Sequence, residues 1–250
     1  MSCQATIAVE MPSDGGLHLR SVAEPATALT IEHFRPGQAG RDHLEAFIRQ
    51  VFLQAYAARI STFYPHLLGI TRPDDAFAAV AGIRPASRGA LFSEFYLDAP
   101  IEDLVADHTG RTIGRAEIAE VGNLAPASAG QARWLIAALT AYLHAAGFTW
   151  VVFTAVPTLY NAFARMGLRP IGLAAADVTR LDPALQDDWG SYYEARPVVY
   201  AGEISQGFRA VNSLIDPALP HLWALWHDAL QLGAATREQL LPVQSNPVGM

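Results

Sequence analysis

The pattern of apolar and polar positions predicts that the folded part of the chain begins with a strand and a helix. Residues 29–34 alternate between apolar and polar side chains, as expected of a strand, and Pro36-Gly37 ends the pattern. From Asp42, which we expect to cap a helix, apolar residues recur at helical spacing to about Arg59. Residues 1–27 contain prolines, a Gly-Gly pair and scattered polar residues, and we expect an irregular leader there.

The next stretch predicts a hairpin followed by two short helices. A short strand ends near Ile70, residues 72–75 have the composition of a turn, and residues 76–84 form the partner strand. From Arg84 to Asp107 apolar residues are mixed with acidic ones, and Ala99-Pro100 divides this segment into two short helices. The predicted order at the beginning is therefore strand, helix, strand, strand.

Residues 115–146 have the most informative pattern, and we expect the rest of the chain to be organised around them. Residues 115–124 resemble a strand whose alternation breaks at Val121-Gly122, which predicts a β-bulge. Residues 126–132 carry no bulky side chain, and a long helix follows. Such a loop presents unpaired N–H groups and the positive end of a helix dipole, so it is a candidate anion site. A simple cap or close packing would explain the same residues.

The C-terminal half predicts one buried strand, one helix and a separate arm. Residues 150–156 are a near-continuous apolar run, and residues 157–166 form a helix closed by Gly167. Residues 197–201 are strand-like, and we expect them to add an edge strand. Residues 211–232 have a helical apolar pattern interrupted by prolines, and their tryptophans indicate that this arm packs on the domain or on a second subunit. We expect residues after about Thr236 to be flexible.

The amino-acid composition indicates the fold class and excludes several kinds of active site. The chain has 250 residues, 51% of them hydrophobic, with a mean hydropathy of +0.17, which favours one α/β domain (28–206) with a leader (1–27) and an arm and tail (207–250). All 17 basic residues are arginine, so lysine Schiff-base chemistry and a P-loop lysine are excluded. Cys3 alone supports neither a disulfide within the chain nor a zinc site of several thiolates.

Charge and hydropathy set expectations for partners and location. A net charge of −7 makes nucleic acid an unlikely partner. No apolar stretch reaches the roughly 20 residues of a membrane span, and the N-terminus lacks the pattern of a signal peptide. We therefore expect a cytoplasmic protein. His221 and His227 do not have the i, i+4 spacing of a zinc pair, and we expect no metal.

The predicted order of elements resembles the core of the GNAT acyltransferases. In that core a strand, a pyrophosphate loop, a helix, a second strand and a second helix follow one another. The loop is usually written Q/R-x-x-G-x-G/A, and residues 127–132 (ASAGQA) keep the last two elements but lack the first. The resemblance implies that the donor is bound by Leu124, Ala125, Ser128, Gly130, Gln131, Ala132 and Arg133.

A closer resemblance rests on four strings in a fixed order. They are LFSEFYLDAPIE (91–102), EVGNLA (120–125), FTAV (153–156) and WGSYYEARPVVYAGEI (189–204). Together they resemble the bacterial family labelled thermostable hemolysin, over roughly residues 45–205. That family is similar to the GNAT fold and especially to acyl-homoserine-lactone synthases. The fold implied is α/β, with a mixed, mostly antiparallel central sheet flanked by helices and a C-terminal helical arm.

The resemblance also implies acyl transfer to an amine and a set of catalytic residues. Arg84, Glu94 and Glu120 occupy places comparable with residues that shape the site in the synthases. We expect Glu120 to be the general base, directly or through water, with a buried ion pair to Arg115 as the alternative. For Glu94 a substrate contact and a structural ion pair with Arg84 or Arg115 are both open.

The remaining candidates surround these acids. Asn123 either presents its amide to a substrate or satisfies backbone groups of the bulge. We expect substrate contacts from Arg84, Tyr96, Arg115, Trp189 and Tyr192. Many GNAT enzymes use a tyrosine four residues before the glycine that ends the second helix to protonate the leaving thiolate. Here that position is Phe163, and Tyr160 lies one turn earlier.

These observations leave three hypotheses for the function. The first is an N-acyltransferase with no permanently bound cofactor, which uses acyl-CoA or a phosphopantetheine-linked acyl donor and a small-molecule amine. An acyl-carrier protein is then an expected partner, and a donor carried by tRNA and a homodimer both stay open. The second hypothesis is a membrane-lysing protein of the hemolysin type, whose inserting segment would be the tryptophan-rich arm. The third is a catalytically inactive GNAT-like binding module.

Overall fold

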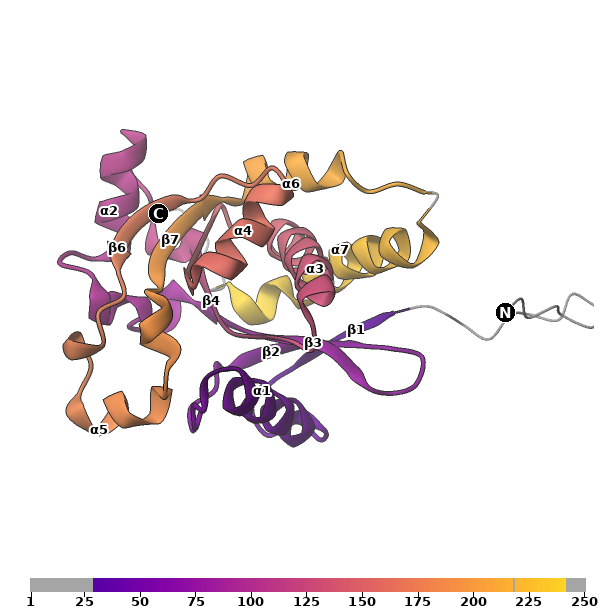
Figure 1. The fold of residues 1–250 in the computed structure, drawn as a ribbon. Coiled ribbons are helices and arrows are strands. Elements are labelled where there is room, and N and C mark those ends of the chain that lie inside the picture. Colours follow the sequence, from indigo (N-terminus) through magenta and orange to yellow (C-terminus); the bar gives the residue numbers. More distant parts are fainter. Residues whose placement is uncertain (1–28, 218, 242–250) are drawn as a thin grey trace, which may run out of the picture.

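The computed structural model describes residues 29–217 and 219–241, which form one seven-stranded sheet with helices on both faces (Figure 1). The strand order is β1-β2-β3-β4-β5-β7-β6, and β4 with β5 is the parallel pair among otherwise antiparallel neighbours. The strands are β1 (Thr30–Phe34), β2 (His66–Thr71), β3 (Phe77–Pro85), β4 (Ile118–Pro126), β5 (Trp150–Ala155), β6 (Ile171–Ala175) and β7 (Val198–Glu203). The predicted fold class is confirmed.

The helices alternate with short 3₁₀ turns along the chain. The α-helices are α1 (Arg41–Tyr56), α2 (Ile101–Thr109), α3 (Ala129–Ala146), α4 (Pro157–Arg165), α5 (Pro183–Gln186), α6 (Ile204–Asn212) and α7 (Pro220–Leu240). The 3₁₀ turns are η1 (Ala86–Arg88), η2 (Ser93–Tyr96), η3 (Arg115–Glu117), η4 (Val178–Arg180), η5 (Asp187–Trp189) and η6 (Tyr192–Ala195).

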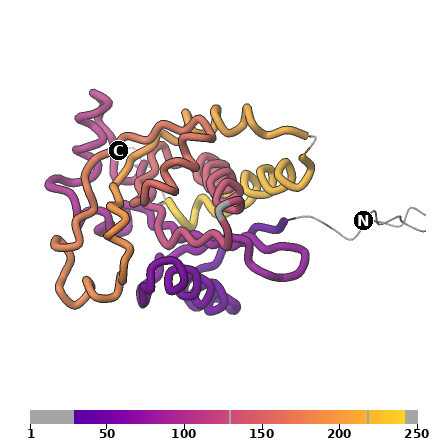
Figure 2. Tube along the Cα trace, in the orientation of Figure 1, coloured from indigo at the N-terminus to yellow at the C-terminus, as the bar shows by residue number. Residues whose placement is uncertain are grey.

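The two faces of the sheet carry different helices. Helices α3, α4, α6 and α7 cover one face, and α1 covers the other (Figure 1). Tyr142 of α3 and Trp226 of α7 are buried in the largest core, on the first face. On the second face, the connection between β6 and β7 returns to the end of α1 (Figure 2), where Ser191 donates its N–H to the carbonyl oxygen of Tyr56 at 2.8 Å.

The segment expected to form a helical arm packs on the domain, which is one of the two arrangements that its tryptophans indicated. Residue 207, where we placed the boundary, falls inside α6. Helix α7 lies along α3, and Leu225, Trp226 and Leu240 are buried in the main core. The expectation of flexibility after Thr236 is wrong for residues 237–240, because they complete α7 and Leu240 is fully buried. The predicted leader and the residues after 241 lie outside the described part of the chain.

Three local predictions also need correction. Helix α1 is preceded by Gly40 in the left-handed region (φ 83°), and Asp42 lies in its first turn instead of capping it. Arg115–Glu117 forms a 3₁₀ turn, so β4 begins only at Ile118. Residues 198–203 form β7 between β5 and β6, not at the edge, because β6, which the pattern did not predict, takes the edge position.

Candidate active site

A cleft opens where the two parallel strands separate. Strands β4 and β5 are paired only from Ile118 with Trp150 to Val121 with Phe153. Beyond that point β4 continues to Pro126 beside β3, while β5 stays with β7. Because the two strands follow different neighbours, they part in the middle of the sheet.

The predicted bulge lies at the mouth of this cleft. The register of β3 with β4 passes from Gly82 opposite Gly122 to Val80 opposite Ala125, so Asn123 and Leu124 have no opposite residue in either neighbouring strand. Asn123 has a left-handed backbone (φ 47°), a conformation that asparagine tolerates better than most residues. The bulge therefore bends β4 away from β5 and leaves two backbone positions facing the cleft without a strand partner.

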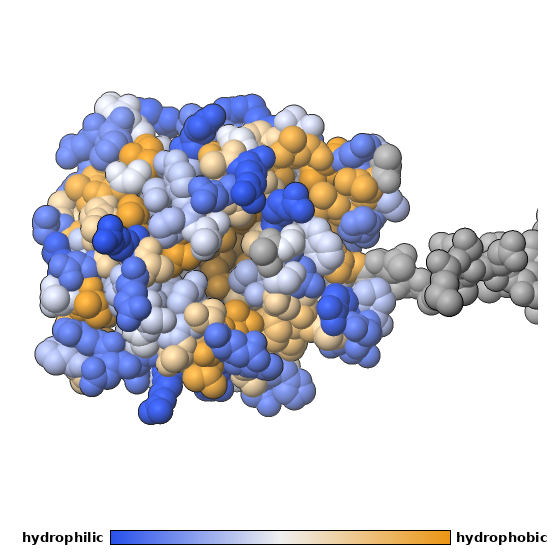
Figure 3. Space-filling model, in the orientation of Figure 1, coloured by the Kyte–Doolittle hydropathy of each residue, from blue (hydrophilic) through white to orange (hydrophobic). Residues whose placement is uncertain are grey.

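The cleft holds a pocket with a cavity volume of about 270 Å³. Its walls come from the bulge, from the loop before α3, from the beginning of α4 and from an aromatic group on the α1 side. In the space-filling view an apolar hollow opens in the middle of the surface between α4 and α1 (Figure 3). The aromatic members of the lining are Phe52, Tyr56, Tyr64, Phe92, Tyr96, Trp189 and Tyr192.

Three of the predicted substrate contacts line this pocket. Trp189 and Tyr192 pack against Phe52, with ring centroids 6.4 Å away in each case. Tyr96 is buried, and its hydroxyl makes a short hydrogen bond with the hydroxyl of Tyr193. Burial is the largest cause that raises the pKa of each of these tyrosines, so the wall is uncharged at neutral pH.

Glu120 is buried on β4, and backbone amides satisfy its carboxylate. One oxygen accepts the N–H of Phe92 at 2.9 Å and the other that of Ser93 at 2.6 Å. The side chain is only 2% exposed and does not line the pocket directly. The alternative partner considered from the sequence is therefore wrong, because Arg115 pairs with other acids. Two amide donors keep an isolated carboxylate stable in the interior without a positive partner.

Glu94 and Arg115 form a separate ion cluster at the surface. Arg115 donates to both oxygens of Glu94, at 2.7 and 2.8 Å, and to Glu102 at 2.6 Å. Burial alone would raise the pKa of Glu94, but the hydrogen bonds from Arg115 and from the amides of Leu91 and Ile101 outweigh it, so the pKa is lowered. These residues line a shallow hollow outside the cleft pocket.

Arg84 also lies outside the pocket lining. Its guanidinium donates to the carbonyl oxygen of Ala90 at 3.1 Å and lies 4.7 Å from the centre of the Tyr64 ring. It faces the same side of the sheet as Glu120, the residue opposite it on β4. Asn123 lines the pocket, and its side-chain oxygen accepts the N–H of Tyr64 at 3.0 Å, which is a backbone group outside the bulge.

Tyr64 is the site residue that sequence reasoning missed. It precedes β2, and its ring lies across Gly82 and Gly122, where a Cβ would come within 2.7 Å and 2.6 Å of Tyr64 atoms. Arg41, which is buried, donates to the carbonyl oxygen of Tyr64 at 2.7 Å. The glycines were visible in the sequence, but what lies against them depends on pairing between distant strands.

The loop before α3 forms the other end of the cleft. Ser128 precedes the helix without capping it through its side chain, and a Cβ on Gly130 would meet nothing closer than Ser128 Oγ at 3.9 Å. The fold itself thus gives no packing reason for a glycine at 130. Gln131 is buried, and its side-chain oxygen has no hydrogen-bond partner among the described residues. Of the predicted donor residues, Leu124 and Ala132 line the pocket, whereas Ala125 is buried behind it and Ser128 and Arg133 are exposed.

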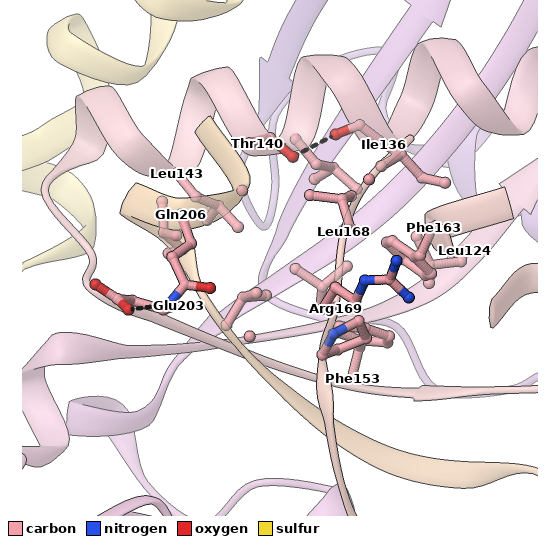
Figure 4. A pocket seen from close by; sticks show the side chains of 18 residues that line it. Leu124, Ile136, Thr140, Leu143, Phe153, Phe163, Leu168, Arg169, Glu203 and Gln206 are labelled. Carbon is pink, nitrogen blue, oxygen red and sulfur yellow. Dashed lines mark hydrogen bonds between the residues drawn. The ribbon is translucent and has the colours of Figure 1, made fainter. Parts of the chain in front are cut away.

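A second, smaller pocket of about 120 Å³ lies on the α3 side of the sheet (Figure 4). Its apolar side chains come from β4, α3, β5 and α4, and Val121 and Leu124 belong to both pockets. Phe163 lines it and stacks on Phe153 at 4.6 Å. Tyr160 instead stacks on Tyr200 at 5.0 Å and lines neither pocket.

With this geometry established, comparison with family models gives one match. A model described as thermostable hemolysin matches residues 34–208, which is more than half of the chain. The protein belongs to the thermostable hemolysin family. No curated protein sequence matches the chain.

Several solved structures resemble this member of the thermostable hemolysin family. TofI in an apo form is 15% identical, with a TM-score of 0.51 over 76% of this chain and 99% of that chain. The acyl-homoserine-lactone synthase LasI is 14% identical, with a TM-score of 0.49 over 71% of this chain and 91% of that one. FeeM, an N-acyl amino acid synthase from uncultured soil microbes, is 13% identical, with a TM-score of 0.49 over 76% and 100%. The first of these shows a shared fold.

Metal sites and membrane-spanning helices are both missing from the described part of the chain. No group of three or more histidine, cysteine or acidic side chains is arranged to hold a metal ion there. No helix in the same part of the chain is long and apolar enough to cross a membrane. The helix that a lysing protein would have to insert, α7, has Trp226 packed in the core, while Trp223 is 42% exposed.

Proposed function

We propose that this protein transfers an acyl group from a thioester donor to the amine of a small molecule. The observation that carries the proposal is the cleft between β4 and β5, which joins a helix N-terminus, a bulge with unpaired backbone positions and an aromatic pocket. A thioester needs space for both the arm that carries it and the acyl chain, and the structure has two neighbouring pockets whose linings share Val121 and Leu124.

The donor enters beside α3. The first turn of this helix offers N–H groups and the positive end of its dipole to the phosphates of coenzyme A or of a phosphopantetheine arm. Gly130 allows the backbone to approach those phosphates closely, because a glycine has no Cβ. An acyl-carrier protein would present the same phosphopantetheine group, so the loop serves either donor.

The acyl chain occupies the second pocket. Its lining is mainly apolar and it continues directly from the bulge, so a chain attached to the thioester carbon can extend past Val121 and Leu124 (Figure 4). Phe163 and Leu168 form part of the wall. Residue 163, where many GNAT enzymes have a tyrosine, is a phenylalanine in this chain. The placement explains the difference, because this side chain contacts the acyl chain and not the sulfur, and so needs no hydroxyl group.

The acceptor amine binds in the aromatic pocket. Seven aromatic side chains surround this space, and Arg165 is the charged residue in the described lining. Such a wall favours an amine carried on an apolar or aromatic body, and it also stabilises a cationic amine through its ring faces. Glu120 removes the proton during attack, and the N–H groups of Asn123 and Leu124 stabilise the negative charge that develops on the thioester oxygen.

The test is release of free thiol together with formation of an amide. Purified protein is incubated with hexanoyl- or decanoyl-coenzyme A and a panel of amines that includes tyramine, phenethylamine and the common amino acids. We expect thiol release that depends on the amine, and an amide of the expected mass, with the aromatic amines preferred. Dye release from liposomes, measured in parallel, should be absent. Dye release without thiol release would replace the proposal by the lysing function, and donor binding without turnover would replace it by the inactive module.

A further inference from the structure

The backbone and the ring of Tyr64 are both held in place by contacts from three different elements. Gly82 and Gly122 leave room for its ring, Asn123 accepts its N–H, and Arg41 donates to its carbonyl oxygen. These contacts come from α1, β3 and β4. They fix a half-buried side chain at the wall of the proposed acceptor pocket.

The hydroxyl group of Tyr64 lies between the pocket and Glu120. It stands over Gly122, where a Cβ would be 2.7 Å from the Tyr64 oxygen. Gly122 and Glu120 are two positions apart on β4, so they face the same side of the sheet. The two groups are also coupled electrostatically, because the charge of Glu120 raises the pKa of the Tyr64 phenol. Tyr64 lines the pocket and Glu120 does not, so the phenol provides a route from the pocket to the buried acid.

Burial and the neighbouring charges indicate that Tyr64 keeps its own proton at neutral pH. Burial raises the pKa of Tyr64 well above its usual value, and the charge of Glu120 raises it further, while Arg84 lowers it. The phenol therefore stays protonated at neutral pH and cannot be the final base. It can pass a proton on, provided that Glu120 takes it, and each carboxylate oxygen has a second lone pair beyond its bond to a backbone amide.

We propose that Tyr64 is a catalytic residue that relays the proton of the attacking amine to Glu120. This inference rests on the proposed acyl transfer. As the amine nitrogen bonds to the thioester carbon, its proton moves to the Tyr64 oxygen and the Tyr64 proton moves to the Glu120 carboxylate. The carbon–sulfur bond then breaks, its electron pair leaves with sulfur, and Glu120 returns the proton through Tyr64 to the thiolate. Glu120 is a carboxylate again at the end, so the cycle balances.

The decisive experiment compares wild type with Tyr64→Phe, which removes the hydroxyl group but keeps the ring over Gly82 and Gly122. Tyr200→Phe is the matched control, because Tyr200 lines neither pocket. The probes are decanoyl-coenzyme A and the best amine of the panel. We expect Tyr64→Phe to lower kcat by about 10²-fold to 10⁴-fold, the range of a positioned acid–base group, with unchanged donor affinity. Tyr200→Phe should retain wild-type turnover.

Two readouts separate a relay from a structural effect. In mixtures of light and heavy water, the wild-type rate should depend on deuterium content in a curved manner, because two protons move, and in Tyr64→Phe in a linear manner. The double variant Tyr64→Phe/Glu120→Gln should be no slower than the slower single variant, since both residues act in one relay.

The outcomes distinguish the relay from the function it rests on. Wild-type kcat in Tyr64→Phe, multiplicative losses in the double variant, or a curve that persists in Tyr64→Phe would overturn the relay and leave acyl transfer standing. A wild-type protein that releases no thiol with any amine would overturn the proposed function, and the relay with it.

Discussion

Glu94 and Glu120 have different surroundings, and the difference indicates which of these two carboxylates stabilises the fold and which one can accept a proton. Glu94 lies at the surface, with both oxygens on Arg115 and a second acid, Glu102, on the same guanidinium. Glu120 is buried, accepts two backbone amides and faces the same side of the sheet as Gly122, over which the Tyr64 ring lies. A carboxylate held by a guanidinium is a poor base because protonation breaks an ion pair. Glu120 has no guanidinium partner, and each of its oxygens has a second lone pair beyond its bond to a backbone amide.

The same contrast assigns different tasks to the two regions. The Glu94 cluster joins η3 to the segment before α2, and so it fixes the shape of the wall that contains Phe92 and Tyr96. Glu120 fixes the same wall from below through the amides of Phe92 and Ser93. We therefore assign Glu94 a structural role and reserve proton transfer for Glu120.

The largest expected effect is on turnover. Glu120→Gln should lower kcat by roughly 10²-fold to 10⁴-fold, because the amide cannot take a proton. Glu94→Gln should retain wild-type kcat and lose on the order of 1 kcal/mol of unfolding free energy, the scale of a partly exposed hydrogen-bonded pair. Steady-state thiol release and chemical denaturation of both variants measure the two quantities. Equal losses of kcat would remove the distinction between the acids.

The next effect concerns the support of Tyr64. Gly122→Ala places a Cβ 2.6 Å from the Tyr64 ring, so the ring must shift from its position over residue 122. A displacement of about 1 Å costs on the order of 10²-fold in rate when a reacting group is misplaced. Gly172→Ala is the matched control, because a Cβ there would meet its nearest neighbour, a carbon of Tyr200, at an ordinary 3.7 Å. A Gly122→Ala variant with wild-type turnover would show that the position of Tyr64 is unimportant.

These features differ in how far the sequence could predict them. The bulge was predictable because Val121-Gly122 breaks a strict alternation within one strand. The cleft was not, since it depends on β4 and β5 choosing different neighbours. Strand β6 escaped prediction because IGLAA is short and rich in small residues. The sequence left open whether Glu94 contacts a substrate or forms an ion pair with Arg84 or Arg115. The pairing with Arg115 could not be predicted, because it depends on the 3₁₀ turn η3, which brings Arg115 to Glu94.

A smaller effect tests whether the donor loop acts apart from both acids. Gly130→Asp should weaken donor binding about tenfold or more through bulk and negative charge, with unfolding free energy retained. Gly130→Ala is the control for bulk alone, since the fold leaves space for a Cβ there. Calorimetric titration with coenzyme A measures both. Unchanged affinity in Gly130→Asp would show that this loop does not bind the donor. The donor would then have to reach Glu120 from another side of the cleft.

The smallest expected effect is a change in the pH dependence of stability that only the Glu94 region should produce. The pKa of Glu94 is lowered in the folded state, so near the unfolded value of about 4.3 the unfolded chain binds more protons. Stability from this pair is therefore complete above about pH 5 and is lost as the pH falls through the folded pKa. Glu94→Gln should flatten the curve of unfolding free energy against pH in that window.

A second pair of groups supplies an internal reference at higher pH. His33 and His66 are hydrogen-bonded to each other at 3.0 Å, and burial is the largest cause that lowers the pKa of each to about 4. Their contribution has the same sign and is lost between pH 6.5 and about 4. Between pH 6.5 and 5, then, Glu94→Gln and wild type should show parallel curves, because the two proteins contain the same histidine pair and the Glu94 contribution changes only below pH 5. If the curves diverge in that upper window, or coincide below pH 5, the Glu94–Arg115 pair does not stabilise the fold as the contrast with Glu120 requires.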